Sequence, residues 1–186
     1  MATTLESVAR EVRSCSKCAL NKSRKNAVPG TGNLNSEILL IGEGPGQNED
    51  LQGLPFVGEA GKFLDELLDA AKLKREDVFI TNVVKCRPPN NRDPLDEEVR
   101  VCTTSYLFDQ IKLIKPKLIV TLGRHSMHLF FPQIRSISEV HGKAYKKANQ
   151  VYMLMYHPAA SLYQANLKNT MKDDFKKIPE ILKQIG

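Results

Sequence analysis

Four cysteines form two pairs whose spacing suits a metal site. Two residues stand between Cys15 and Cys18, so both sulfurs can face one ion, while fifteen separate Cys86 from Cys102. Four thiolates bind either tetrahedral zinc or a 4Fe-4S cluster, and spacing alone does not choose between them. A zinc ribbon usually repeats the short spacing, so the long second interval mildly favours iron and sulphur. The alternative is four free cysteines in the core.

Residues 42–46, Gly-Glu-Gly-Pro-Gly, follow a short apolar run and form a second candidate for chemistry. A phosphate-binding loop would carry Lys-Ser or Lys-Thr after the glycines, and Pro45 has no amide hydrogen to donate. The segment therefore does not predict nucleotide binding. Gly42 and Gly44 instead allow the main chain to approach a flat ligand closely, although glycines alone also fit an ordinary tight turn.

Three further side chains could contact such a ligand. Phe56 lies in a loop framed by proline and glycine, where an aromatic ring either stacks on a flat ligand or fills the core. Asn82 follows a β-branched run and offers an amide donor and acceptor. His157 precedes Pro158, which restrains the histidine to an extended backbone and aims its ring out of the sheet. A lone histidine is more often structural, so His157 counts only in combination with the others.

Short apolar runs predict the strands that position these groups, at residues 38–41, 78–84, 118–122 and 151–156. Helices are expected at residues 5–12, 58–73, 93–112 with Asp93-Pro94 as its start, 124–130, and 162–185 with an interruption at Pro179. This alternation predicts an α/β fold with a doubly wound, mainly parallel four-stranded sheet and helices on both faces. Ligands bind at the carboxyl edge of such sheets, which would gather Gly42, Asn82, His125 and His157.

Composition limits the class of protein further. The 186 residues fit one domain, 1–186, and 41% of them are hydrophobic, which is enough for one sizeable core. Lys and Arg outnumber Asp and Glu by 27 to 21, and a pI near 9.1 suits a polyanionic partner such as nucleic acid or an acidic membrane surface. We find no membrane-spanning run or secretion signal, so we expect a cytoplasmic protein with no membrane partner and reduced thiols.

The motifs together resemble those of the iron-sulphur uracil-DNA glycosylases, the family-four enzymes. The resemblance covers nearly the whole chain and rests on residues 42–46 with Glu49 and Asp50, residues 54–58, 81–89 and 157–160, and the cysteines. It implies the doubly wound α/β fold and a structural 4Fe-4S cluster on Cys15, Cys18, Cys86 and Cys102. It also implies a hydrolase that excises uracil from DNA and so initiates base excision repair of deaminated cytosine. We expect a monomer that acts at the nucleoid on uracil-containing DNA. A sliding clamp could recruit it, although no residue indicates one.

The resemblance also assigns roles within the expected pocket. The turn of Gly42, Glu43 and Gly44 would line the uracil pocket and position water, Phe56 would stack on the base, and Asn82 would read its edge. His157 would be the catalytic histidine, donating a hydrogen bond to uracil O2 as charge develops there. Glu49, the second catalytic candidate, would either wall the pocket near position 5 of the base or favour the sugar cation. Since residue 44 is not a carboxylate, a dissociative route is expected.

Contacts with the DNA backbone and duplex are expected from two groups of residues. Lys85 and Arg87, near a strand end, are candidates for phosphate contacts, with Arg92 and Arg124 as further ones. Ser161 or Leu162 could wedge into the duplex as the base leaves, although Leu162 could equally face the core. Two other functions stay open: a glycosylase of the same fold for other deaminated bases, and a non-catalytic zinc module that binds DNA.

Overall fold

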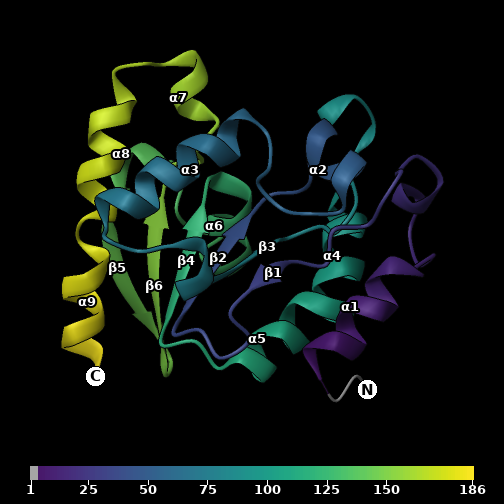
Figure 1. Cartoon of the computed structure of the whole chain (residues 1–186), viewed down its shortest axis with the longest axis horizontal. Helices are drawn as coiled ribbons and strands as arrows, with labels where there is room; N and C mark the ends of the chain where they lie inside the picture. Colours follow the sequence, from purple (N-terminus) through teal and green to yellow (C-terminus); the bar gives the residue numbers. More distant parts are fainter. Residues whose placement is uncertain (1–3) are drawn as a thin grey trace.

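The sheet at the centre of the computed structural model, which describes residues 4–186, has six strands in the order β1-β3-β2-β4-β6-β5 (Figure 1). Four of them are parallel neighbours: β3 (Val78–Asn82), β2 (Ile38–Gly42), β4 (Leu118–Leu122) and β6 (Gln150–Met155). Each coincides with a predicted strand. All residues of β2, β3 and β4 are buried, as expected of parallel strands covered on both faces.

The prediction of four strands was wrong at both edges, where the sheet becomes mixed. The strand β1 (Thr31–Gly32) pairs antiparallel with β3, and β5 (Lys143–Lys147) pairs antiparallel with β6. The two residues of β1 are too few to form an apolar pattern that a sequence search could detect. Strand β5 carries three lysines and is mostly exposed, which suits an edge strand but hides it from a search for apolar runs.

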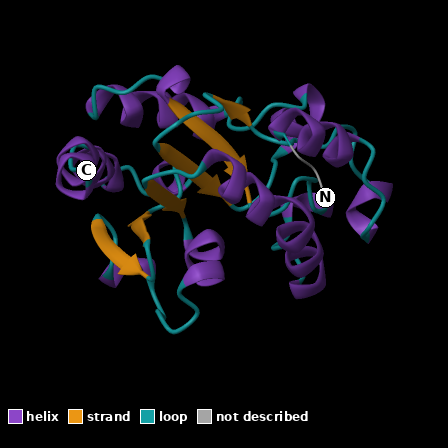
Figure 2. Cartoon of the chain, turned by 90° about the horizontal axis from the view of Figure 1, so that it is seen from below, coloured by secondary structure: helices purple, strands orange, loops and turns teal. Residues whose placement is uncertain are grey.

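Helices cover both faces of the sheet, as predicted (Figure 2). Their bounds are α1 (Leu5–Arg13), α2 (Gln47–Gln52), α3 (Glu59–Ala70), α4 (Asp96–Cys102), α5 (Phe108–Ile114), α6 (Arg124–Phe130), α7 (Ala160–Tyr163), α8 (Leu167–Phe175) and α9 (Ile178–Ile185). A π-helical turn, Thr103–Leu107, joins α4 to α5. Short 3-10 turns lie at Ala19–Lys22, Arg75–Asp77, Pro89–Asn91 and Ile137–Glu139.

Alternate residues of each central strand enter two different cores. Leu39 and Ile119 lie in a core that also holds side chains of α1, α5 and α6, whereas Leu40 and Val120 lie in one with side chains of α3, α8 and α9. In Figure 1, α8 and α9 lie at the left of the strands and α1 and α5 at the lower right. Burying both faces fixes the register, because a slip by one residue would exchange the two sets of side chains.

Two predicted helix boundaries were wrong. The helix expected from Asp93 begins at Asp96, because the Glu98 carboxylate accepts the Leu95 amide hydrogen and caps the helix there. The closing helix is three helices, α7 to α9, and Pro179 lies in the first turn of α9, where its missing amide hydrogen breaks no bond. Within residues 4–186, no helix combines the length and the apolar character needed to cross a membrane.

Candidate active site

A pocket of about 290 Å³ lies where the loops after β2, β3 and β6 meet. We call it the edge pocket. Its lining includes Glu43, Glu49, Phe56, Asn82 and His157, all of which the resemblance assigned to the expected pocket. It also includes residues that sequence reasoning missed as pocket-lining: Ala60, Pro88, Asn91, Arg92 and Ala159. The predicted ligand-binding residues other than Gly42 therefore line one cavity.

Phe56 and His157 form one wall of the edge pocket. Their ring centroids are 5.5 Å apart with an interplanar angle of 29°. Phe56 has a φ of 53°, an unfavourable backbone conformation for a bulky side chain. The Arg75 guanidinium donates hydrogen bonds to the carbonyl oxygens of Pro55 and Phe56 and so holds this loop. Backbone strain of this kind tends to persist at functional sites. No sequence motif pointed to Arg75.

Asn82 supplies the edge pocket with an unsatisfied polar group. Its side chain is only 2% exposed, and Oδ1 has no hydrogen-bond partner among the residues that the structure describes. Leaving a buried acceptor unpaired costs about 1–3 kcal/mol, so a ligand that donates to it would gain this energy on binding. The Asn82 carboxamide is therefore arranged to read a donor on a bound molecule.

Gly42 keeps the space beside Asn82 and Phe56 open. A Cβ atom at this position would lie 2.4 Å from Asn82 Oδ1 and 2.9 Å from the Phe56 ring. We expect Gly42→Ala to reduce ligand binding and the turnover of the expected substrate, uracil-containing DNA, by at least about 100-fold, because Asn82 and Phe56 must shift out of position. Turnover of the purified variant would check this, with far-ultraviolet circular dichroism to show that the variant is folded. Wild-type turnover in a folded Gly42→Ala protein would contradict it.

His157 is held in one tautomer. The Ala159 amide donates a hydrogen bond to Nδ1, 3.1 Å away, so the neutral ring carries its proton on Nε2. Burial lowers the pKa of His157 from 6.5 to about 4, with His125 adding to the shift and Glu49 opposing it. Gly123, with a φ of 91°, lets β4 end close to this ring, since a Cβ atom there would lie 2.9 Å from His157 Cβ. His157 is thus a neutral hydrogen-bond donor near pH 7.

Glu49 organises the loops around the edge pocket. Its two carboxylate oxygens accept hydrogen bonds from the amides of Gly46, Val57 and Gly58, at 3.1, 2.8 and 2.9 Å. These bonds tie α2 to the segment that carries Phe56. Sequence reasoning assigned Glu49 to the pocket but gave no hint of its amide partners, which follow from the turn between α2 and α3.

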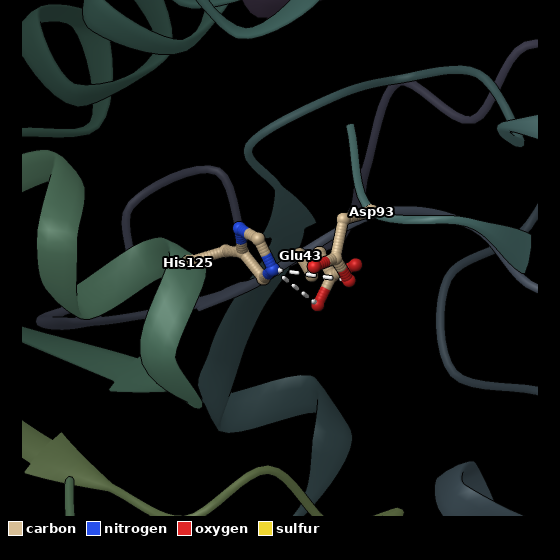
Figure 3. Close-up of side chains that lie close together, drawn as sticks. All are labelled: Glu43, Asp93 and His125. Atoms are coloured by element: carbon tan, nitrogen blue, oxygen red, sulfur yellow. Dashed lines mark ion pairs between the residues drawn. The ribbon is translucent and has the colours of Figure 1, made fainter. Parts of the chain in front are cut away.

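Glu43 belongs to a cluster of charged side chains beside the edge pocket (Figure 3). His125 Nε2 lies 3.6 Å from Glu43 Oε2 and 3.3 Å from Asp93 Oδ1. Burial raises the pKa of the Glu43 carboxyl, and the nearby imidazole of His125 opposes this shift. Asp93 also pairs with Arg124. The sequence placed His125 at this edge but missed Asp93 as its partner.

The four cysteines line a second cavity, between α1, the end of β3 and α4. Cys15 and Cys18 are partly buried, and Cys86 and Cys102 are buried. Arg24 Nη1 donates to Cys86 Sγ at 3.0 Å, and its Nη2 donates to the Cys15 carbonyl at 2.8 Å. Positive donors of this kind stabilise thiolates, which is the form that binds metal. The predicted ligand set is therefore gathered in one place, with a guanidinium that sequence reasoning did not include.

Comparisons with known proteins identify the family of this chain. The family model of the uracil DNA glycosylase superfamily matches residues 29–183. The type-4 uracil-DNA glycosylase of Saccharolobus solfataricus is 50% identical over 187 aligned residues, which cover 96% of this chain and 86% of that protein. The chain belongs to the type-4 uracil-DNA glycosylase family. The type-4 protein of Archaeoglobus fulgidus is 49% identical, with 96% of this chain and 93% of that protein covered.

A solved structure supports the fold of this type-4 family member. The solution NMR structure of a Methanosarcina acetivorans protein superposes with a TM-score of 0.53 at 14% identity. The match covers 83% of this chain and 98% of that one. At this identity the likeness concerns the fold alone.

The expected DNA contacts of this type-4 family member need two corrections. Lys85 is 1% exposed, so its ammonium group cannot reach a phosphate. Ser161 is 2% exposed, and its hydroxyl donates to the Pro158 carbonyl, so it is no wedge. Leu162 is half exposed at the end of α7, next to Tyr163, which is 88% exposed and was missed by sequence reasoning. Leu162 and Tyr163 follow His157 by five and six residues in the chain, and both are exposed at the surface.

The remaining arginines differ in how firmly they are held. Arg87 Nε donates to Asn91 Oδ1 at 2.7 Å, which leaves its terminal nitrogens for another partner. Arg92 makes a two-pronged ion pair with Glu98, and Arg124 pairs with Asp93. Arg87 therefore stays a candidate phosphate contact, whereas Arg92 and Arg124 are engaged within the protein.

Proposed function

We propose that the chain hydrolyses the N-glycosidic bond of uracil in DNA. The observation that carries this proposal is the convergence of Phe56, His157 and the unpaired Asn82 Oδ1 on one pocket. A base within a duplex is out of reach of such a pocket, so the uracil nucleotide must be flipped out of the stack at a cost of a few kcal/mol. The relatives named type-4 uracil-DNA glycosylases support the same substrate.

Asn82 selects uracil over cytosine in this proposal. Uracil presents an N3–H donor and an O4 acceptor, which match the Oδ1 and Nδ2 of one carboxamide. Cytosine has an acceptor at N3 and an amino donor at position 4, so both contacts fail. Because Asn82 is buried, a wrong base leaves its polar atoms without partners, and a site of this kind rejects such a base strongly.

His157 and Glu49 act on the two charges that form as the bond breaks. The Nε2–H of His157 donates a hydrogen bond to uracil O2, where negative charge develops on the leaving base. Glu49 holds the Phe56 loop through its three amide contacts, and its negative charge favours the cation-like sugar. Since Gly44 carries no carboxylate, bond breaking precedes the attack of water.

Leu162 and Arg87 complete the proposal on the DNA side. Leu162 fills the gap that the flipped base leaves, with Tyr163 beside it, and Arg87 contacts a phosphate. Incubation of the protein with a uracil-containing oligonucleotide, followed by alkali, tests the activity. We expect alkali-labile sites at uracil and none at hypoxanthine or xanthine. Intact uracil strands would refute the proposal, and cleavage at hypoxanthine would point to a broader glycosylase.

We also propose that the cysteines hold a 4Fe-4S cluster. Within residues 4–186, Glu43, Asp93 and His125 place three possible metal-ligand atoms within 4.8 Å of one another. No three cysteine sulfurs of these residues lie that close together. Tetrahedral zinc would draw four sulfurs to about 3.8 Å from each other, given a Zn–S bond of about 2.3 Å. The wider spacing supports the larger cluster. When bound, the cluster supplies a cross-link between the N-terminal segment, β3 and α4.

The cluster gives a prediction for metal content. We expect Cys102→Ser to lose iron and acid-labile sulfide. It should also melt several degrees lower, because loss of the cross-link lowers the free energy of unfolding, and each kcal/mol lost lowers Tm by about 2–4 °C in a chain of this size. Thr104→Ser, an exposed change near the same helix end, should keep both. Iron and sulfide per chain after anaerobic purification decide the matter. A colourless wild-type protein that contains zinc would overturn the assignment and favour a non-catalytic zinc module.

A further inference from the structure

Lys85 is buried and lines the cysteine cavity, next to the proposed cluster ligand Cys86 and three residues after Asn82 of the edge pocket. All three hydrogens of its ammonium group have acceptors: Thr81 Oγ1 at 2.6 Å, the Asn82 carbonyl oxygen at 2.7 Å and Gln110 Oε1 at 2.7 Å. Within the described part of the chain, no carboxylate forms an ion pair with it. Burying an ammonium group without a carboxylate partner is costly, and the three hydrogen bonds, together with the nearby Cys86 and Cys102 when these are ionised, offset that cost.

The contacts of Lys85 converge on the end of β3. Thr81 and Asn82 are the last two residues of that strand, so the ammonium group binds the backbone at the point where the Asn82 side chain leaves for the pocket. Gln110, on α5, donates from Nε2 to the Pro29 carbonyl at 2.6 Å, and Thr81 Oγ1 is 3.2 Å from the same oxygen. The network is closed and leaves this segment little freedom to move.

The cysteine site holds Lys85 from the other side. Its backbone amide donates to Cys102 Sγ at 3.2 Å, and its carbonyl accepts from the Val28 amide at 2.7 Å. The same residue therefore contacts a cluster ligand through its main chain and the base-reading residue through its side chain. This continuous path connects the cysteine site with the pocket.

We propose that Lys85 is a positioning residue for base recognition, which fixes the end of β3 so that Asn82 presents its carboxamide at the angle that uracil requires. The inference rests on the proposed function and deepens it, by giving a buried lysine and the cysteine site a part in specificity. Lys85 touches neither base nor sugar. Its loss acts on the uracil to cytosine ratio through Asn82.

Two substitutions and a matched control test this role. Lys85→Met keeps the length of the side chain but removes its charge and its donors. Thr81→Val removes one of the three acceptors and preserves the β-branched shape. Thr121→Val is the control. Thr121 lies on β4 and pairs with Ile41 of β2 from the side opposite Thr81, and its buried hydroxyl has no partner among the described residues.

The readout is the ratio of single-turnover excision rates for uracil and cytosine, with iron content and melting temperature measured in parallel. We expect the ratio to fall about 100-fold in Lys85→Met and about 10-fold in Thr81→Val, and to change less than about twofold in Thr121→Val. Inhibition by free uracil should weaken in the same order. The salt dependence of DNA affinity should stay at the wild-type slope in every variant.

Unchanged ratios in folded Thr81→Val and Lys85→Met would overturn the inference. A salt slope reduced by about one in Lys85→Met would also overturn it, because that is the signature of a phosphate contact. If Lys85→Met does not fold, the uracil to cytosine ratios of Thr81→Val and Thr121→Val are compared instead. Equal ratios in these two variants would overturn the inference. Failure of the wild-type protein to excise uracil would instead refute the proposed function, and the two failures are thus distinguishable.

Discussion

Replacement of His157 with alanine is expected to slow single-turnover excision of uracil by about 10²–10³-fold, the usual loss when one donor to a developing oxyanion is removed. The imidazole is fixed in position by the Ala159 amide and by its contact with Phe56, so its Nε2–H is arranged before the bond breaks. Affinity for DNA should stay within a few-fold of wild type, because the proposed phosphate contact, Arg87, is not among the residues that line the edge pocket.

His128→Ala is the matched control for that measurement. His128 lies on α6, is exposed and contacts only the Ile134 carbonyl in the described structure, so its loss should leave excision unchanged. Excision at the wild-type rate by His157→Ala would remove this histidine from the mechanism.

The low pKa of His157 has a consequence for pH dependence. The folded protein binds a proton at this ring only near pH 4, whereas the unfolded chain does so near 6.5. Stability contributed by the neutral ring is therefore complete above pH 6.5 and declines as the pH falls toward 4. The rate ratio of wild type to His157→Ala should be constant between about pH 6 and 8, because the ring stays neutral there.

Asn82→Asp is expected to carry the second largest effect. A carboxylate in place of the carboxamide cannot donate to uracil O4, but it can accept from the amino group of cytosine. We expect the uracil rate to fall and the uracil to cytosine ratio to drop by at least about 100-fold. Paired oligonucleotides that differ only in the target base would measure both rates.

Asn149→Asp introduces the same change at an exposed position and should leave the ratio unaltered. If Asn82→Asp discriminated as well as wild type, the buried carboxamide would not be the group that reads the base, and its unpaired oxygen would need another explanation.

The central strands and the pocket could be predicted from sequence because both follow local patterns. Residues 38–41 and 118–122 are apolar runs that only a buried parallel strand explains, and their ends carry the groups that meet in the pocket. Phe56, Asn82 and His157 were placed together on this basis and by the resemblance. Strand β5 was not predicted, because it forms by pairing with β6 and its own lysine-rich sequence has no strand-like apolar pattern.

Partners distant in sequence could not be predicted. The role of Lys85 depends on Gln110, twenty-five residues later, and a lysine beside a strand end reads as a surface charge until its neighbours are known. Arg24 and Arg75 likewise act through carbonyl oxygens and a sulfur that no spacing reveals. Asp93 was assigned to a helix cap because an acidic side chain before a proline favours a helix start. The carboxylate that caps the helix is instead that of Glu98, which accepts the Leu95 amide hydrogen.

A crystal structure of the protein with uracil, the released base, would show whether Phe56, Asn82 and His157 bind one base together. We predict that the ring lies against Phe56, that the Asn82 carboxamide pairs with N3 and O4, and that His157 Nε2 lies within about 3 Å of O2. Uracil bound away from these three residues, or in the pocket with Asn82 Oδ1 still unpaired, would contradict it.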